Sequence, residues 1–172
     1  MMKQYFHTKQ YFSTRHHLLA KQCLLALVFA LAPLAQGMAQ RNEIHNPRIA
    51  TLQVVAGTDW LSMPITQLGG TPINIDFDDL THDYHRYAYR IIHCDSNWQP
   101  SDGLSDTDYL QGVNGEYLID DVEQSINTNQ IYTHYHLAIP NEHYQLKMSG
   151  NYQLVVYDDN SGEEMLTACF MV

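Results

Sequence analysis

The nine residues Ser149-Gly-Asn-Tyr-Gln-Leu-Val-Val-Tyr157 establish the fold class, because their side chains alternate between the two faces of a β-strand. One face carries Tyr152, Leu154 and Val156, and the other carries Gln153, Val155 and Tyr157. The following residues 158–162 (DDNSG) have the composition of a hairpin turn. This pattern places Tyr152 in a core, where its hydroxyl can anchor a corner of a β-sandwich.

Six further segments are short, rich in β-branched and aromatic residues, and bounded by Gly, Asn, Asp or Pro. They are residues 49–55, 60–66, 72–77, 84–94, 131–139 and 166–172. Region 103–129 is weaker and predicts either short strands or a one-turn helix. Because no window shows the apolar stripe of a helix, we expect an all-β protein. About seven strands predict an antiparallel, immunoglobulin-like β-sandwich.

The first 39 residues have the three-part pattern of a secretory signal peptide. A basic segment precedes the apolar stretch 23–35, and small residues Gly37 and Ala39 precede a cleavage point at Gln40. The thirteen apolar residues are fewer than the roughly 20 that a membrane-spanning helix needs. We therefore expect an exported protein whose mature chain, residues 40–172, is one β-sandwich domain without a membrane-spanning segment.

Charge excludes two classes of partner. The 172-residue chain has a net charge of −10, and its residues after position 40 hold five Lys and Arg against nineteen Asp and Glu, a net charge of −14. Binding to nucleic acid or to an anionic membrane needs clustered basic residues, so neither partner is expected. An apolar content of 45% is too high for a disordered chain, and a packed core is expected.

Cysteine and histidine supply the candidates for chemistry. Cys94 and Cys169 are either small buried strand residues or a single disulfide, which an oxidising compartment permits. A reactive thiol is the third alternative, and it is disfavoured because no basic residue adjoins Cys169. His93 and Cys94 are adjacent in a strand and point to opposite faces, so they cannot act as base and nucleophile on each other. The sequence holds none of the common catalytic motifs, and we expect no catalytic residues and no enzyme.

His134 and His136 share one strand face, a spacing that chelates Zn or Cu if a neighbouring strand adds a third ligand. The alternative is cross-strand aromatic packing. Residues 76–79 and 158–164 are acidic and could hold a weak Ca²⁺, although solvated turns are the simpler interpretation. We expect no metal and no cofactor.

Residues 97–102 (NWQPSD) place a Trp close to a Pro outside any alternating strand. Aromatic anchors in loops are typical of binding surfaces. The alternative is that Trp98 folds back as a lid on the core.

Several phrases, taken in order, resemble the N-terminal domain of the type IX secretion system plug protein family of Bacteroidetes, formerly a domain of unknown function. The phrases are residues 77–80 (FDDL), 87–102 (YAYRIIHCDSNWQPSD), 109–110 (YL), 125–128 (SINT), 132–135 (YTHY), 139–141 (IPN), 149–152 (SGNY) and 170–172 (FMV). The resemblance extends over roughly residues 48–172. Members of that family continue into further β domains.

The resemblance implies an exported, all-β, non-enzymatic subunit at the periplasmic face of the outer membrane, which closes the translocon pore from the inside. Its partner would be the outer-membrane translocon barrel, with no small-molecule substrate. A rigid wedge needs an aromatic and polar contact patch, for which the candidates are Trp98, Gln99, Pro100 and Tyr109. The alternatives are an exported carbohydrate-binding or adhesive β-sandwich, and a metal-dependent enzyme using His93, His134 or His136.

Overall fold

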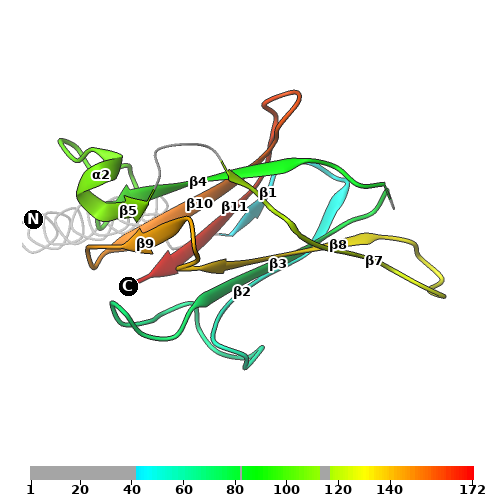
Figure 1. Ribbon diagram of the computed structural model, residues 1–172, viewed down its shortest axis with the longest axis horizontal. Coiled ribbons are helices and arrows are strands. Elements are labelled where there is room, and N and C mark those ends of the chain that lie inside the picture. The colour runs from blue at the N-terminus through cyan, green and yellow to red at the C-terminus, as the bar shows by residue number, and fades with distance from the viewer. Residues whose placement is uncertain (1–41, 82, 113–116) are drawn as a thin grey trace, which may run out of the picture. The chain divides into compact units, whose positions relative to one another are not determined.

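In the computed structural model of the protein, residues 42–81, 83–112 and 117–172 are described, and the predicted signal peptide lies outside them. The described residues all belong to one compact unit. They form antiparallel sheets with a single turn of helix (Figure 1), so the predicted all-β sandwich of antiparallel sheets is confirmed. No helix within these residues has the length and apolar character that crossing a membrane requires.

The strands form two main sheets and a small third one. The five-stranded sheet has the order β1 (Glu43–Ile44), β11 (Glu164–Met171), β10 (Asn151–Asp158), β4 (Tyr87–Cys94), β6 (Tyr117–Leu118). The four-stranded sheet has the order β2 (Ile49–Ala56), β3 (Ile73–Asp79), β8 (Thr133–Ile139), β7 (Asp121–Gln124). The third sheet pairs β5 (Leu110–Gly112) with β9 (Tyr144–Leu146).

Alternation decides which side chains of the four-stranded sheet enter the core. Every second residue of β3 and of β8 is buried, beginning with Ile73 and Thr133, and the residues between them are only partly buried. Aromatic rings fill much of the interior: Phe77 stacks on Tyr135 with ring centroids 5.2 Å apart, and Tyr152 stacks on Phe170 at 5.4 Å. Such pairs add stabilisation beyond the burial of their area.

Strand β10 lies at the centre of the five-stranded sheet, between β4 and β11, as its alternating sequence predicts. Tyr152 is fully buried, and its hydroxyl donates to the Met148 carbonyl at 2.7 Å, so the predicted corner contact is confirmed. Gly150 is required by close packing, since a Cβ there would lie 2.3 Å from His93 Nε2. The predicted turn at 158–162 joins β10 to β11, and Gly162 donates to the Asp158 carbonyl.

The predicted strand at 60–66 is wrong, because residues 57–72 form a loop in which only Ile65 makes an isolated bridge, to Met171 of β11. Its composition suits a strand, but Pro64 has no amide proton to donate to a ladder. Within the predicted weak region, both alternatives occur: a one-turn helix α2 (Asp106–Tyr109) and the short strands β5, β6 and β7.

Candidate functional site

Residues 97–102, which we call the contact loop, follow β4, and Asp95 holds this loop closed. The Oδ1 atom of Asp95 accepts the backbone N–H groups of Asn97 at 2.7 Å and of Gln99 at 3.0 Å. The Asp95 amide donates to the Gln99 carbonyl at 2.8 Å, and Trp98 N–H donates to the Asp95 carbonyl. The Asp95 carboxylate thus accepts hydrogen bonds from backbone N–H groups two and four residues further along the chain. These bonds take the place of hydrogen bonds to a neighbouring strand, so the loop has one defined conformation.

Trp98 adopts a left-handed backbone conformation, with φ of 61°. For a bulky residue this is a strained conformation that persists only where neighbouring contacts impose it. One such contact is Gln153 of β10, whose Nε2 donates to the Trp98 carbonyl at 3.2 Å. Trp98 is partly buried, while Gln99 and Pro100 are exposed. These three residues therefore occupy one preformed loop, with Trp98 neither fully buried nor fully exposed.

Tyr109 does not lie on the contact loop. Because its side chain is buried, the prediction that it contacts a partner is corrected. Its side chain is only 4% exposed and lies against the rings of His93 and Tyr152. The hydroxyl donates to Asp106 Oδ1 at 2.6 Å. Burial, together with that carboxylate, raises the pKa of Tyr109. Its position in α2 turns the ring inward, which the polar sequence around it does not reveal.

His93 and Ser101 form a pair that the sequence interpretation missed. His93 Nδ1 lies 2.8 Å from Ser101 Oγ, while Nε2 faces the Ser149 carbonyl at 3.5 Å. The ring packs edge-on against Tyr152 at 5.1 Å. Through these two contacts the His93 ring joins the contact loop to the loop before β10.

The two cysteines lie on opposite sides of β10. Cys94 pairs with Asn151 and Cys169 pairs with Gln153, so their Cα atoms are separated by two strand spacings, roughly 9.5 Å, and by a further two residues along β10. A disulfide needs a Cα separation below about 7 Å. Both thiols are buried, which confirms the interpretation as small strand residues and excludes the bridge. Burial, and to a smaller extent Cys169, raises the pKa of Cys94 to about 11.

The outer face of the four-stranded sheet carries two His–Asp pairs. His134 Nδ1 lies 2.7 Å from Asp78 Oδ1, and His136 Nδ1 lies 2.7 Å from Asp76 Oδ1. The expected aromatic packing of these histidines is wrong, because the register of β3 against β8 sets carboxylates opposite them. Among the described residues, no three His, Cys, Asp or Glu side chains are grouped to hold a metal ion.

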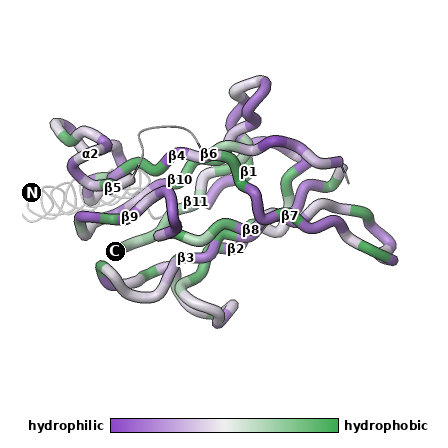
Figure 2. The backbone as a smooth tube through the Cα atoms, viewed as in Figure 1, coloured by the Kyte–Doolittle hydropathy of each residue, from purple (hydrophilic) through white to green (hydrophobic). Residues whose placement is uncertain are grey.

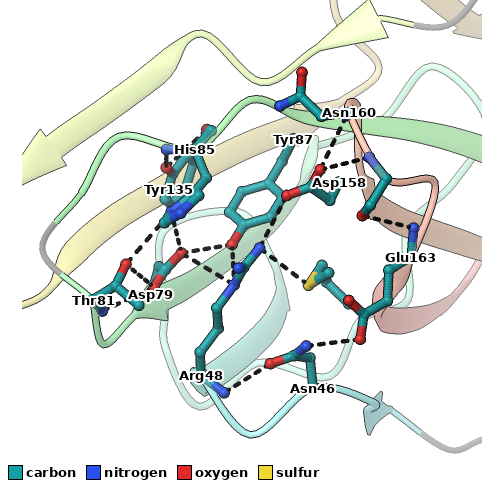
Figure 3. Close-up of polar contacts among 12 residues, drawn as sticks. Asn46, Arg48, Asp79, Thr81, His85, Tyr87, Tyr135, Asp158, Asn160 and Glu163 are labelled. Carbon is teal, nitrogen blue, oxygen red and sulfur yellow. Dashed lines mark hydrogen bonds and ion pairs between the residues drawn. The ribbon is translucent and has the colours of Figure 1, made fainter.

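A largely buried polar cluster lies at the first residue of β4, whereas the contact loop follows the last residue of that strand. Figure 3 shows the side chains of this cluster. We call Arg48, Asp79, His85, Tyr87 and Asp158 the polar cluster. They come from both main sheets: Arg48 precedes β2 and Asp79 ends β3, while Tyr87 begins β4 and Asp158 ends β10. The cluster therefore ties the two sheets together at this end of the sandwich.

Asp79 is the centre of the polar cluster and is fully buried. Its Oδ2 accepts the Tyr87 hydroxyl at 2.6 Å and lies 2.9 Å from His85 Nδ1. Its Oδ1 accepts both the backbone and the hydroxyl of Thr81. Four donors around one carboxylate satisfy the hydrogen-bonding needs of a buried charge. The interpretation of residues 76–79 as a solvated turn is therefore wrong, because they complete β3.

Arg48 connects Asp79 to Asp158. Its Nε donates to the Tyr87 hydroxyl at 3.1 Å, and its terminal nitrogen donates to Asp158 Oδ2 at 3.0 Å. Burial by itself raises the pKa of Asp79, but hydrogen bonds from Tyr87 and Thr81 and the neighbouring His85 outweigh it, so the pKa lies below its ordinary value. The pKa of Asp158 is also lowered, because hydrogen bonds from Ser161, Asn160 and Arg48 outweigh burial.

The polar cluster was detectable in part from the sequence. The residues Ile73, Ile75 and Phe77 alternate inward, and the same parity directs Asp79 into the core. An inward carboxylate requires partners, yet the strand pattern does not say which. Each of the five side chains contacts another member of the cluster, so the arrangement stabilises the fold.

The family model of the type 9 secretion system plug protein 1st domain matches residues 49–172. The chain belongs to this plug protein family. The resemblance seen in the sequence is thus confirmed, and the chain has a role related to type IX secretion. The plug protein family is one of secretion-system components rather than a known enzyme family. A search of curated proteins finds no match.

Among solved structures, this plug-family chain is similar to the crystal structure of a hypothetical protein from Parabacteroides merdae. The two share 40% sequence identity with a TM-score of 0.72, and the match covers 77% of this chain and 34% of that chain. The chain therefore spans about a third of the length of that solved relative.

Proposed function

We propose that this domain is an exported, non-enzymatic part of the type IX secretion machinery that binds the outer-membrane translocon barrel from the periplasm and helps to close its pore. The observation that carries this proposal is the plug-family match over residues 49–172. The signal-peptide pattern of the first 39 residues supports export.

The architecture suits a plug. A body that occludes a pore has to resist deformation, and packed interiors are close to crystalline in density. Here two sheets enclose a core rich in stacked aromatic rings, and the polar cluster joins the sheets at one end. These features favour a rigid protein-binding body.

The contact loop supplies the proposed surface for the barrel. Trp98, Gln99 and Pro100 lie on a loop that Asp95 and Gln153 hold in one conformation. A preformed loop loses little conformational entropy on binding, so a larger share of its contact energy appears as affinity. Backbone strain in a bulky residue outside regular structure is a reason to suspect a functional constraint.

The test is the substitution Trp98→Ala, measured as the affinity of the purified chain for the isolated translocon barrel. Alanine keeps the side-chain Cβ at the same strained backbone position, so the change isolates the indole. We expect a loss of about 2 kcal/mol or more, roughly thirtyfold in Kd, if Trp98 is an anchor residue.

Trp60→Ala is the matched control, because it removes the other tryptophan, which lies in a different loop, between β2 and β3, and should leave barrel affinity unchanged. Unchanged affinity of the Trp98→Ala variant would remove the contact loop from the interface. A large fall in Tm for Trp98→Ala would instead show that the ring serves as a lid on the core.

A further inference from the structure

The loop between β2 and β3, residues 57–72, exposes large apolar side chains to solvent. We call it the apolar loop. Its exposed side chains include Trp60 at 71%, Leu61 at 73% and Met63 at 71%, together with Ile65 at 47% and Leu68 at 50%. Asp59 is its single charged residue. Figure 2 shows pale and green stretches in this loop, whereas the turn between β10 and β11 is hydrophilic.

The apolar loop is held in place by its own backbone and by the sandwich. Ser62 Oγ donates to the Ala56 carbonyl at 2.6 Å, and Gln53 Nε2 donates to the Trp60 carbonyl at 3.0 Å. Thr66 Oγ1 donates to the Thr71 carbonyl at 2.7 Å. The polar groups are thus directed to the protein and the large apolar side chains to water, the reverse of the usual arrangement.

The apolar loop runs beside the last residues of the closing strand. Met171 N–H donates to the Pro64 carbonyl at 2.9 Å, and Thr66 N–H donates to the Met171 carbonyl at 3.0 Å. Figure 1 shows the C-terminal end of β11 on the same side of the sandwich as this loop. An open hollow of about 460 Å³ adjoins it, lined by Ile65, Thr66, Gln67, Gly70 and Thr71.

The composition and order of the apolar loop are those of a protein interface. Clustered exposed apolar side chains mark interaction sites in proteins. Interface centres are enriched in Trp and Met and depleted of charge. Because the backbone is already fixed, a partner would bury these side chains without first ordering the loop.

We propose that the apolar loop is the docking surface for the domain that follows the first domain in plug-family proteins. The family model describes a first domain and its match runs to Val172, and the solved relative is about three times the matched length. A polypeptide that continues from β11 emerges next to Thr66 and Pro64, so the tether holds it at high effective concentration beside the loop.

The predicted occupant is therefore an apolar face of a folded domain covalently linked to β11, which packs on Trp60, Leu61 and Met63 and enters the hollow beside Ile65. This surface differs from the contact loop. About three strand spacings, roughly 15 Å, separate Cys94 at the base of the contact loop from Ile65, counted through Asn151 and Met171. Loss of barrel binding and loss of domain docking can thus be told apart.

The first test compares this chain alone with a chimera in which residues 42–172 replace the matched part of the Parabacteroides merdae protein. Hydroxyl-radical labelling followed by mass spectrometry measures the oxidation of Trp60 and Met63. We expect both residues to be labelled severalfold less in the chimera. Ile126 and Ile131, which are 79% and 52% exposed in the β7–β8 turn, should be labelled equally in both proteins.

The second test needs no chimera. The polypeptide of the relative outside the matched part is titrated into this chain by calorimetry, after circular dichroism has shown it to be folded. We expect saturable binding with a negative heat-capacity change, weakened about tenfold or more by Trp60→Ser with Leu61→Ser. The matched control, Ile126→Ser with Ile131→Ser, should bind as the parent chain does.

Equal labelling of Trp60 in the chain and the chimera would overturn the proposal, as would equal weakening by the two double variants. Protection of Trp60 in the chain alone that disappears on dilution would also overturn it, because the occupant would then be a second copy of the chain. If the chimera does not fold, the titration decides.

Discussion

Strand β2 has a charged network at its first residue and an apolar surface after its last. Arg48 enters the polar cluster just before β2, and the apolar loop begins directly after Ala56. At the first end a fully buried carboxylate is paired, and at the second end Trp60 and Leu61 are more than two-thirds exposed. The usual distribution of polar and apolar side chains is inverted at both ends.

This contrast separates residues that hold the domain together from residues available to others. Burying Asp79 is tolerable only because Tyr87, Thr81 and His85 contact it, so the polar cluster is committed to the fold. The side chains of the apolar loop do little for the isolated domain, since most of their surface remains in water. Substitutions at the two ends should therefore have opposite consequences for stability and for binding.

The largest effect is expected at the polar cluster. Asp79→Ala removes the central acceptor and leaves Arg48 and His85 without their shared partner, which should lower the free energy of unfolding by about 3 to 5 kcal/mol. Urea unfolding at neutral pH measures this loss as a lower midpoint. Asp159→Ala is the matched control, because its pair with Arg86 has side chains that are 28% and 53% exposed, whereas Asp79 is fully buried, and its loss should change stability by less than about 1 kcal/mol. Similar losses in both variants would contradict a special role for the polar cluster.

A smaller effect is expected on the stability of the protein at acidic pH. Asp79 and Asp158 both have pKa values below their ordinary ones, so in the unfolded chain they bind protons at a higher pH than in the folded chain. The stability they contribute is complete above the unfolded pKa of about 4 and is lost as the pH falls through the folded pKa. Urea unfolding between pH 6 and pH 2 should show this loss, and Asp158→Asn should make the dependence shallower. An unchanged acid profile in that variant would disprove the contribution of Asp158.

The smallest effect on stability is expected at the apolar loop. Trp60→Ser with Leu61→Ser removes two side chains that are 71% and 73% exposed, so the free energy of unfolding should change by no more than about 0.5 kcal/mol. Thermal or urea unfolding of the purified chain measures it, with Ile126→Ser and Ile131→Ser as the comparison. A loss of several kcal/mol would mean that the loop covers the core, and the contrast between the two ends of β2 would disappear.

The main strands and the identity of the central strand were accessible from the sequence, because alternation is a local property of the chain. Ser149–Tyr157 and the segment around Ile73 show their inward residues directly. The sequence predictions were wrong where the outcome depended on a contact with another segment, which the local pattern does not show. Residues 60–66 have strand composition but pair with β11 only at one isolated bridge around Ile65. Tyr109 lies in a polar segment that one helical turn directs inward.

The candidate site was accessible only in part. Residues 97–102 were identified as a loop with an aromatic residue, yet the closure by Asp95 and the hydrogen bond from Gln153 depend on how β4 lies against β10. The inward position of Asp79 follows from the parity of β3. Its neighbours His85 and Arg48 do not, because nothing in a strand pattern specifies contacts between loops.

The amino-acid sequence alone determined that this protein is an all-β sandwich, that Tyr152 is buried at its centre, and that it resembles the plug family. These conclusions rest on the alternation of side chains along each strand and on short sequence motifs that occur in a fixed order. Both are properties of the linear sequence. Only the tertiary structure decided which residues meet. Arg48 reaches Asp158 across 110 positions, and Cys94 is kept from Cys169 by an intervening strand. Strand register over such separations is set by the packing of the whole core, which local sequence does not encode.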